Sequence, residues 1–170
     1  SLNENDIGDF KTFLKLSPPL RTENDRLSLI EGLNDGTIDV IVSDHKPEDE
    51  ESKRLTFAQA ATGAAGVETL LPLALELFHN KSIKLEKLIA SMTSNPAKIL
   101  EINKGCLDIG NDADLCLLDI NKPWIVKQNE LKSKSKNTPI ENRNLQGQII
   151  KTFVKGEILF EKNWLYMEYF

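Results

Sequence analysis

Three β-branched residues in a row, Val, Ile and Val at positions 40–42, constrain the fold of this chain more than any other feature of its sequence. A continuous apolar run of this kind is typical of a strand that is buried on both faces of a sheet. The run lies in segment 37–43, which follows a helix predicted to begin after Thr22 as its N-cap and to stop at Gly36. Helix, short glycine turn and buried strand together predict a parallel α/β fold.

Polar side chains follow this predicted strand at once, beginning with Ser43, Asp44 and His45. The carboxyl ends of parallel strands are where α/β proteins build their sites, so Asp44 is a candidate functional residue on physical grounds alone. The structural alternative is an aspartate that caps the following loop. Because adjacent strand residues point to opposite faces, His45 is expected to be structural and to bond a loop or a neighbouring strand.

Further helices are expected over residues 67–79, after Ser82 as an N-cap, and from Asn95 as an N-cap with Pro96 at the first helical position. Pro72 requires the first of these helices either to start close to it or to kink. The helical part of the chain therefore extends to about residue 103.

Short strands are predicted beyond that point, so the α/β pattern gives way near residue 104 to a small β unit. A tight hairpin turn at Lys155-Gly156 joins the last two strands. Cys106 and Cys116 are expected to be free thiols in the core of this unit, although the sequence leaves a disulfide open. The strand candidates are residues 113–120, 124–126, 148–154 and 157–160.

The composition argues against several classes of function. The 170 residues carry 21 lysines and arginines against 26 acidic residues, a net charge of −5, which argues against nucleic-acid binding. No apolar run approaches the ~20 residues that span a membrane, and no basic-then-apolar leader opens the chain, so a cytoplasmic protein is expected. With 2 histidines, and 2 cysteines that match no metal-ligand spacing, the chain cannot build a complete histidine-rich metal site by itself.

Several stretches of the sequence resemble one enzyme superfamily. The sequences SNPAKIL at 94–100 and KGCLDIGNDADLCLLD at 104–119 resemble the junction between barrel and β-sandwich in the amidohydrolase superfamily. The stretches LSPPLR at 16–21, DGTIDVIVSDHKP at 35–47 and SKSKNTP at 133–139 resemble more narrowly its dihydroorotase branch. The resemblance covers nearly the whole chain and corresponds to the C-terminal part of such an enzyme.

This resemblance implies an α/β fold, namely the C-terminal part of a (β/α)8 TIM-type barrel followed by a small β-sandwich unit. A barrel of this type needs ~250 residues, so the chain cannot hold a complete one. We therefore expect residues 1–103 to be the C-terminal segment of the barrel, residues 104–163 to be part of the β-sandwich domain, and residues 164–170 to be an aromatic tail. In the family, the His-x-His pair, the bridging lysine and further histidine ligands lie upstream of the residues present here.

The resemblance also implies roles for individual residues. Asp44 corresponds to the aspartate of the last barrel strand, which would bind zinc in the intact protein and carry the catalytic proton from the attacking water to the departing amide nitrogen. Ser17 stands where the family usually has a substrate-binding asparagine, and Glu48 where it usually has a substrate-binding histidine. Thr62 and Gly63 match the stretch whose backbone meets the substrate ring.

The resemblance implies part of a dihydroorotase-like, metal-dependent cyclic amide hydrolase, which interconverts dihydroorotate and N-carbamoyl-aspartate in pyrimidine biosynthesis and is inactive as this chain alone. One alternative is a cyclic amidohydrolase of the allantoinase or dihydropyrimidinase type. Another is a non-catalytic dihydroorotase-like subunit that scaffolds aspartate transcarbamoylase. The departures at Ser17 and Glu48 keep this second alternative open, because a carboxylate at position 48 would repel an anionic substrate unless it is protonated or turned away.

The expected partners follow from these hypotheses. They are a small-molecule substrate, and either further copies of the chain or a missing N-terminal half that covers the unpaired strand edge and the bare apolar surface of a partial barrel. For Glu48 the structural alternative is a solvated residue in the acidic run 48–51.

Overall fold

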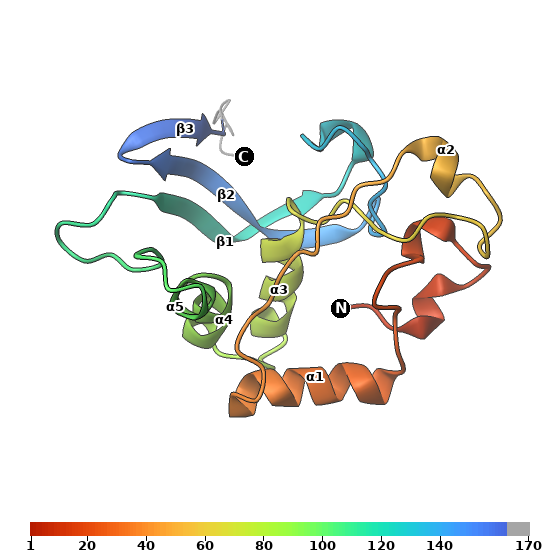
Figure 1. Cartoon of the computed structure of the whole chain (residues 1–170), viewed down its shortest axis with the longest axis horizontal. Coiled ribbons are helices and arrows are strands. Elements are labelled where there is room, and N and C mark those ends of the chain that lie inside the picture. The colour runs from red at the N-terminus through yellow and green to blue at the C-terminus, as the bar shows by residue number, and fades with distance from the viewer. Residues whose placement is uncertain (163–170) are drawn as a thin grey trace, which may run out of the picture.

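The computed structural model describes residues 1–162, in which helices pack against a three-stranded antiparallel sheet (Figure 1). The predicted aromatic tail at 164–170 lies outside these residues. The elements run in the order 3₁₀ helices Glu4–Ile7 and Thr12–Leu14, α1 (Glu23–Asp35), α2 (Glu50–Lys53), α3 (Leu70–His79), α4 (Leu85–Met92), α5 (Ser94–Ile99), β1 (Leu115–Ile125), 3₁₀ helix Gln128–Glu130, β2 (Asn144–Val154) and β3 (Glu157–Glu161).

The first predicted helix is confirmed together with both of its ends. The hydroxyl of Thr22 accepts a hydrogen bond from the Asp25 N–H at 3.2 Å, and the Asp25 carboxylate accepts one from the Thr22 N–H at 3.1 Å. This reciprocal pair satisfies two backbone donors that the start of a helix leaves unpaired. At the other end, Gly36 has a φ of 89°, a left-handed conformation in which a side chain would be strained.

Three further helices form where helices are predicted, although all three begin at other residues, and α3 starts at Leu70 instead of residue 67. Pro72 lies in the first turn of α3, where its missing N–H would have no intrahelical partner, so the helix starts close to it. The predicted caps are wrong, because α4 begins after Lys84 instead of Ser82 and α5 after Thr93 instead of Asn95. The N–H of Ser82 is still bonded to a carbonyl of α3, so the turn that ends α3 continues through it. None of the helices within residues 1–162 has the length and hydrophobicity of a membrane span.

The β unit is a meander in the order β1-β2-β3. The register of β1 against β2 shifts between Asp119 and Pro123, which joins two of the predicted strands into one irregular strand. Lys155 and Gly156 have φ values of 51° and 83°, the positive values that a two-residue hairpin turn requires, so the predicted hairpin is confirmed.

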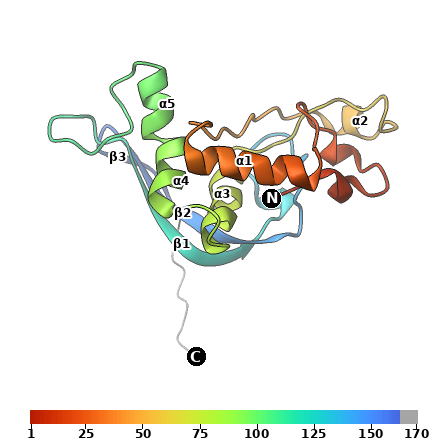
Figure 2. The same cartoon turned by 90° about the horizontal axis from the view of Figure 1, so that it is seen from below.

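The main core lies between the helices and the sheet, where α1 packs against α3 and α4 through Ile30 and Leu33 (Figure 2). Leu75 and Leu88 are fully buried at its centre, and burial of such side chains contributes about 1.5–3 kcal/mol each. Gly147 of β2 has a φ of 105°, and a Cβ there would lie 2.3 Å from Cδ1 of Leu75, so both its backbone conformation and the approach of α3 favour glycine. A second cluster is formed by Val126, Leu131, Ile140 and Leu145.

The predicted buried strand at 37–43 does not form in this structure. The Ile41 N–H donates to the Ser91 carbonyl at 3.0 Å, but no strand of the described residues pairs with the segment. Val42 is 70% exposed, whereas its sequence context predicts burial on both faces. A strand is held by its hydrogen-bonded neighbours, and residues 1–162 place no parallel strand beside this one.

Both cysteines are free, as predicted, but they are exposed, and the expectation that they lie in the core of the β unit is wrong. Cys116 lies at the start of β1, where its neighbours Leu115 and Leu117 are also exposed. β3, next to this end of the sheet in the meander, is exposed along its whole length. This end of the sheet therefore has no cover within residues 1–162.

Candidate functional site

The loop that carries Asp44 lies beside the loop that carries Thr62 and Gly63. The N–H of Lys46 donates to the carbonyl of Ala64 at 3.0 Å, so the two segments run side by side between the end of segment 37–43 and the start of α3. The predicted proton carrier and the predicted ring-contacting residues therefore come from adjacent loops.

His45 fastens the first of these loops to the turn before α3. Its Nδ1 accepts hydrogen bonds from the backbone N–H groups of Gly66 at 3.1 Å and Val67 at 3.3 Å. A ring nitrogen that accepts presents its lone pair, so Nδ1 of His45 serves here as a hydrogen-bond acceptor. The prediction that His45 is structural and bonds a neighbouring loop is confirmed.

The close approach of the two loops depends on glycine at position 63. Gly63 has a φ of 138°, and a Cβ there would lie 2.5 Å from the carbonyl oxygen of Lys46. Gly66 is similar, since its Cβ would lie 2.9 Å from the carbonyl oxygen of Ser43. A side chain at either position would push the two backbones apart.

Asp44 itself is exposed, and its carboxylate has no hydrogen-bond or ion-pair partner among residues 1–162. Its φ is 41°, a left-handed value that few non-glycine residues adopt, although aspartate does so more often than most. Residues held in such conformations cluster at functional sites. An accessible, unpaired carboxylate is free to bind a ligand or to exchange a proton, which is what the predicted role of Asp44 requires.

Ser17 lies in a segment whose backbone is bonded, at Lys15, to the loop of Gly63. The N–H of Gly63 donates to the carbonyl of Lys15 at 3.0 Å, and the Lys15 ammonium donates to the carbonyls of Ala58 and Ala60 at 2.8 and 2.7 Å. Ser17 follows two residues later, is exposed, and makes no side-chain hydrogen bond within residues 1–162. The structure thus places Ser17 next to the Gly63 loop, with its hydroxyl free.

A buried lysine, which sequence reasoning missed, ties these segments together. Lys53 at the end of α2 is 1% exposed, and its ammonium donates to the carbonyls of Thr12 at 3.1 Å, Lys15 at 3.3 Å and Ala61 at 2.8 Å. Burial lowers the pKa of the Lys53 ammonium below its ordinary value, and the nearby charge of Glu48 opposes this shift. Lys53 therefore connects the segment before Ser17 to the loop before Thr62.

Glu48 differs from the acidic residues that follow it. Its side chain is 21% exposed, whereas those of Glu50 and Glu51 are 70% and 82% exposed. The ammonium of Lys46 lies 3.4 Å from its carboxylate. Glu48 is therefore a half-buried, paired residue at the edge of the candidate site, and not part of a solvated acidic run.

Asn137 is the other residue that sequence reasoning missed. It is 3% exposed, and its side-chain amide donates to the Gly63 carbonyl at 3.1 Å and accepts from the Glu48 N–H at 3.2 Å. The stretch at 133–139, which contains Asn137, resembles dihydroorotases in sequence. This resemblance implied no role for any of its residues. This stretch belongs to the β unit, so both parts of the chain contribute to the candidate site.

The described residues do not form a metal site by themselves. Residues 1–162 contain no group of three or more His, Cys, Asp or Glu side chains placed to hold a metal ion. His45 is engaged with backbone N–H groups, and His79 donates from Nε2 to the Ile120 carbonyl at 3.0 Å. Zinc takes three or four protein ligands, and Asp44 would supply one. Residues 1–162 therefore do not fit a zinc ion without ligands from elsewhere.

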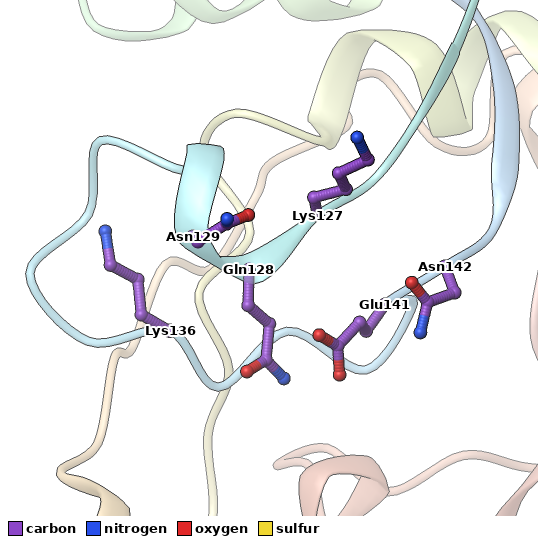
Figure 3. Close-up of a pocket in the computed structure, with 6 residues that line it drawn as sticks. All are labelled: Lys127, Gln128, Asn129, Lys136, Glu141 and Asn142. Atoms are coloured by element: carbon purple, nitrogen blue, oxygen red, sulfur yellow. The ribbon is translucent and has the colours of Figure 1, made fainter.

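An open depression of about 710 Å³ lies on the β unit (Figure 3). It contains none of the five residues predicted from the sequence to form a site, so the candidate site remains with the paired loops described above. Its lining consists of the polar side chains of Lys127, Gln128, Asn129, Lys136, Glu141 and Asn142.

Comparison with known proteins identifies relatives for almost the entire chain. Residues 14–159 match the model of the amidohydrolase family. A dihydroorotase of Ehrlichia canis (strain Jake) is 44% identical over 160 residues, which are 94% of this chain and 36% of that enzyme. A dihydroorotase of Acetivibrio thermocellus is 42% identical over 158 residues, or 92% of this chain and 37% of that enzyme. The chain thus spans little more than a third of the length of the curated relatives it matches.

Solved structures of hydantoinases share the fold. The L-hydantoinase (dihydropyrimidinase) from Arthrobacter aurescens superposes with a TM-score of 0.86 at 34% identity, covering 98% of this chain and 38% of that one. The dihydropyrimidinase from Brevibacillus agri superposes with a TM-score of 0.83 at 23% identity, covering 91% of this chain and 35% of that one. The second likeness supports the fold alone.

Proposed function

This chain belongs to the amidohydrolase family, and from that premise we propose that it forms the C-terminal part of a dihydroorotase-like enzyme that opens and closes a cyclic amide. The observation that carries this proposal is the unpaired carboxylate of Asp44 on a loop that lies against the loop of Thr62 and Gly63. The reaction would be the interconversion of dihydroorotate and N-carbamoyl-aspartate, in the cytoplasm.

Asp44 is the proposed catalytic residue. A carboxylate is ionised near neutral pH, so it accepts a proton from the attacking water and then donates it to the amide nitrogen as the C–N bond breaks. In the reverse direction the same carboxylate takes the proton from the nitrogen that closes the ring. Its carboxylate is exposed and unpaired within residues 1–162, so it is accessible for this transfer.

The other predicted residues come from segments near or bonded to the loop of Asp44. The backbone groups of Gly63 are already bonded, its N–H to Lys15 and its carbonyl to Asn137, whereas those of Thr62 have no partner within residues 1–162. We therefore assign the contact with the amide ring to the backbone of Thr62, with Gly63 allowing the close approach. The hydroxyl of Ser17 is free to donate or accept.

We propose that Glu48 lies at the edge of the substrate site and that its charge does not prevent an anionic substrate from binding. Lys46 lies 3.4 Å from its carboxylate and offsets its charge. This ion pair reduces the repulsion expected from a glutamate at position 48. The carboxylate of dihydroorotate is therefore compatible with the proposed site.

Substrate kinetics on the complete enzyme test the proposed function. We expect kcat/KM to be highest for dihydroorotate among dihydroorotate, allantoin and dihydrouracil. A preference for allantoin or dihydrouracil would favour an allantoinase or dihydropyrimidinase type of enzyme. No turnover of any of the three, together with co-purification of aspartate transcarbamoylase, would favour the non-catalytic scaffold.

Zinc is proposed to bind only in the complete enzyme, with Asp44 as one ligand and the others from residues that this chain does not contain. Members of the family are typically metal-dependent, but the described residues alone offer too few ligands. We predict that the purified 170-residue chain binds no stoichiometric zinc and hydrolyses no dihydroorotate. Elemental analysis and an activity assay measure this, and zinc held by Asp44 in the isolated chain would contradict it.

We also propose that the chain contributes to two domains of the complete enzyme. Residues 1–103 would complete a (β/α)8 barrel, and residues 104–163 a β-sandwich, with strands from the part of the relatives that this chain does not cover. The large apolar side chains that are exposed in the described part of the chain support this, because a neighbouring part of the complete enzyme would cover such side chains. The exposed residues include Ile99, Leu100, Leu107, Ile109, Ile158 and Leu159.

This bare surface predicts how the isolated chain behaves. We expect the 170-residue chain to self-associate, because segment 37–43 has an unpaired edge and the sheet end at β3 is uncovered. Light scattering measures the mass in solution. A monomer that unfolds cooperatively and binds no dye for apolar surfaces would contradict the proposed fold of the complete enzyme.

A further inference from the structure

We infer that the buried amide of Asn137 is a positioning residue of the proposed active site, which holds the loop of Asp44 against the loop of Gly63. This inference rests on the proposed function for its kinetic consequence but not for its geometry. The amide uses both of its ends, because Nδ2 donates to the Gly63 carbonyl at 3.1 Å and Oδ1 accepts from the Glu48 N–H at 3.2 Å.

The backbone of Asn137 adds a third bond to the same place. Its carbonyl accepts from the Ala65 N–H at 3.2 Å, two residues after Gly63. Asn137 is thus bonded to both loops. Its amide holds the donor Nδ2 and the acceptor Oδ1 in fixed directions. Asparagine is the side chain with this length and this pair of groups, since aspartate lacks the donor and glutamine is longer by one methylene.

The segment that carries Asn137 is itself anchored. The Glu68 carboxylate accepts from the N–H of Lys132 at 2.7 and 2.9 Å and from the N–H of Ser133 at 3.0 Å. Asn137 is also 89 residues distant from Glu48 in the sequence, so the bond crosses from the β unit to the loop of the active site. The position of this loop therefore depends on the β unit.

A catalytic consequence follows from where the bonded groups lie. Glu48 is four residues after Asp44 with no helix or strand between them, and the Gly63 carbonyl is next to the Thr62 backbone. Loss of the amide removes one bond from each loop, while the bonds of His45 and Lys46 to the second loop remain. Misplacement of catalytic groups by about 1 Å costs on the order of 10²-fold in rate. Asn137 touches no reacting atom and acts through these loops.

The test compares Asn137→Ala, Asn137→Asp and the control Asn129→Ala in the complete enzyme. Asn129 is an exposed residue of the same β unit that makes no side-chain hydrogen bond within residues 1–162. The measurements are kcat, KM, the thermal midpoint and the hydrogen-exchange rate of the Glu48 amide. We expect Asn137→Ala to lower kcat/KM by at least about 10-fold and to speed Glu48 exchange by at least about 10-fold.

The aspartate variant distinguishes the contribution of the amide donor from that of the amide acceptor. It still accepts from the Glu48 N–H but cannot donate to the Gly63 carbonyl, so Glu48 exchange is expected to stay slow while kcat/KM falls. Asn129→Ala is expected to match the wild type in both. If the alanine variant does not fold, the aspartate variant decides, because its change leaves the shape of the side chain intact.

Two results would overturn the inference. One is a lower thermal midpoint in the Asn137 variants with wild-type kcat and KM, which is what a merely structural residue produces. The other is a Glu48 exchange rate in Asn137→Ala equal to that of the wild type. If the wild-type enzyme turns over none of the three cyclic amides, the proposed function fails, and Glu48 exchange still decides whether Asn137 holds the loop.

Discussion

Asp44→Asn in the complete enzyme is expected to lower kcat/KM for dihydroorotate by at least ~10²-fold, the usual scale of general acid–base catalysis. Asparagine is nearly isosteric with aspartate but cannot carry a proton near neutral pH. The Asp44 carboxylate has no partner among residues 1–162, so the substitution breaks no hydrogen bond or ion pair of the described chain. The fold should therefore be kept, with the circular dichroism spectrum unchanged. Because Asp44 is also a proposed zinc ligand, the zinc content of the variant is measured beside its rate.

Asp39→Asn is a matched control for this experiment. Asp39 is exposed in the same segment 37–43, and the change removes the same charge without touching the loop of Asp44. We expect this variant to keep the wild-type kcat/KM. Activity of Asp44→Asn within a few-fold of the wild type would move the catalytic role to another residue and would favour the scaffold hypothesis.

The helix α1 shows which parts of this fold are readable from the sequence. Its two ends are decided by side chains within three residues of the cap, namely the Thr22 and Asp25 pair, and by the φ of Gly36. The hairpin at Lys155-Gly156 is equally local. Such elements need no distant partner, so their sequence patterns are sufficient.

The segment 37–43 and Asn137 show what the sequence does not reveal. The β-branched run at 40–42 predicts a buried strand, but burial and pairing depend on neighbouring strands that residues 1–162 do not contain. Asn137 meets Glu48 and Gly63 across 89 and 74 residues, and the stretch at 133–139 resembles dihydroorotases without showing which of its residues makes these contacts. The sequence therefore predicts a site on the loop of Asp44, whereas the contacts that position this loop are visible only in three dimensions.

Lys53→Met is expected to lower the free energy of unfolding of the complete enzyme by about 2–4 kcal/mol, since bonds to a charged donor contribute about 1.5–3 kcal/mol each and the desolvation of the buried ammonium offsets part of their sum. Methionine keeps the length and volume of the side chain. The carbonyls of Thr12 and Lys15 retain backbone donors, whereas the carbonyl of Ala61 loses its partner. Urea unfolding measures the difference.

The control Lys134→Met removes an exposed lysine with no partner in the described chain, and it is expected to leave stability unchanged. The pH dependence gives an independent check. Burial holds the pKa of Lys53 below 10.5, so between the folded pKa and 10.5 the unfolded chain binds more protons, and the wild type gains stability as the pH rises. The methionine variant lacks this gain, so the difference between the two proteins should grow toward alkaline pH. A difference that shrinks with rising pH would mean that the Lys53 ammonium is not desolvated, and equal stabilities of wild type and Lys53→Met would mean that it does not hold the three carbonyls together.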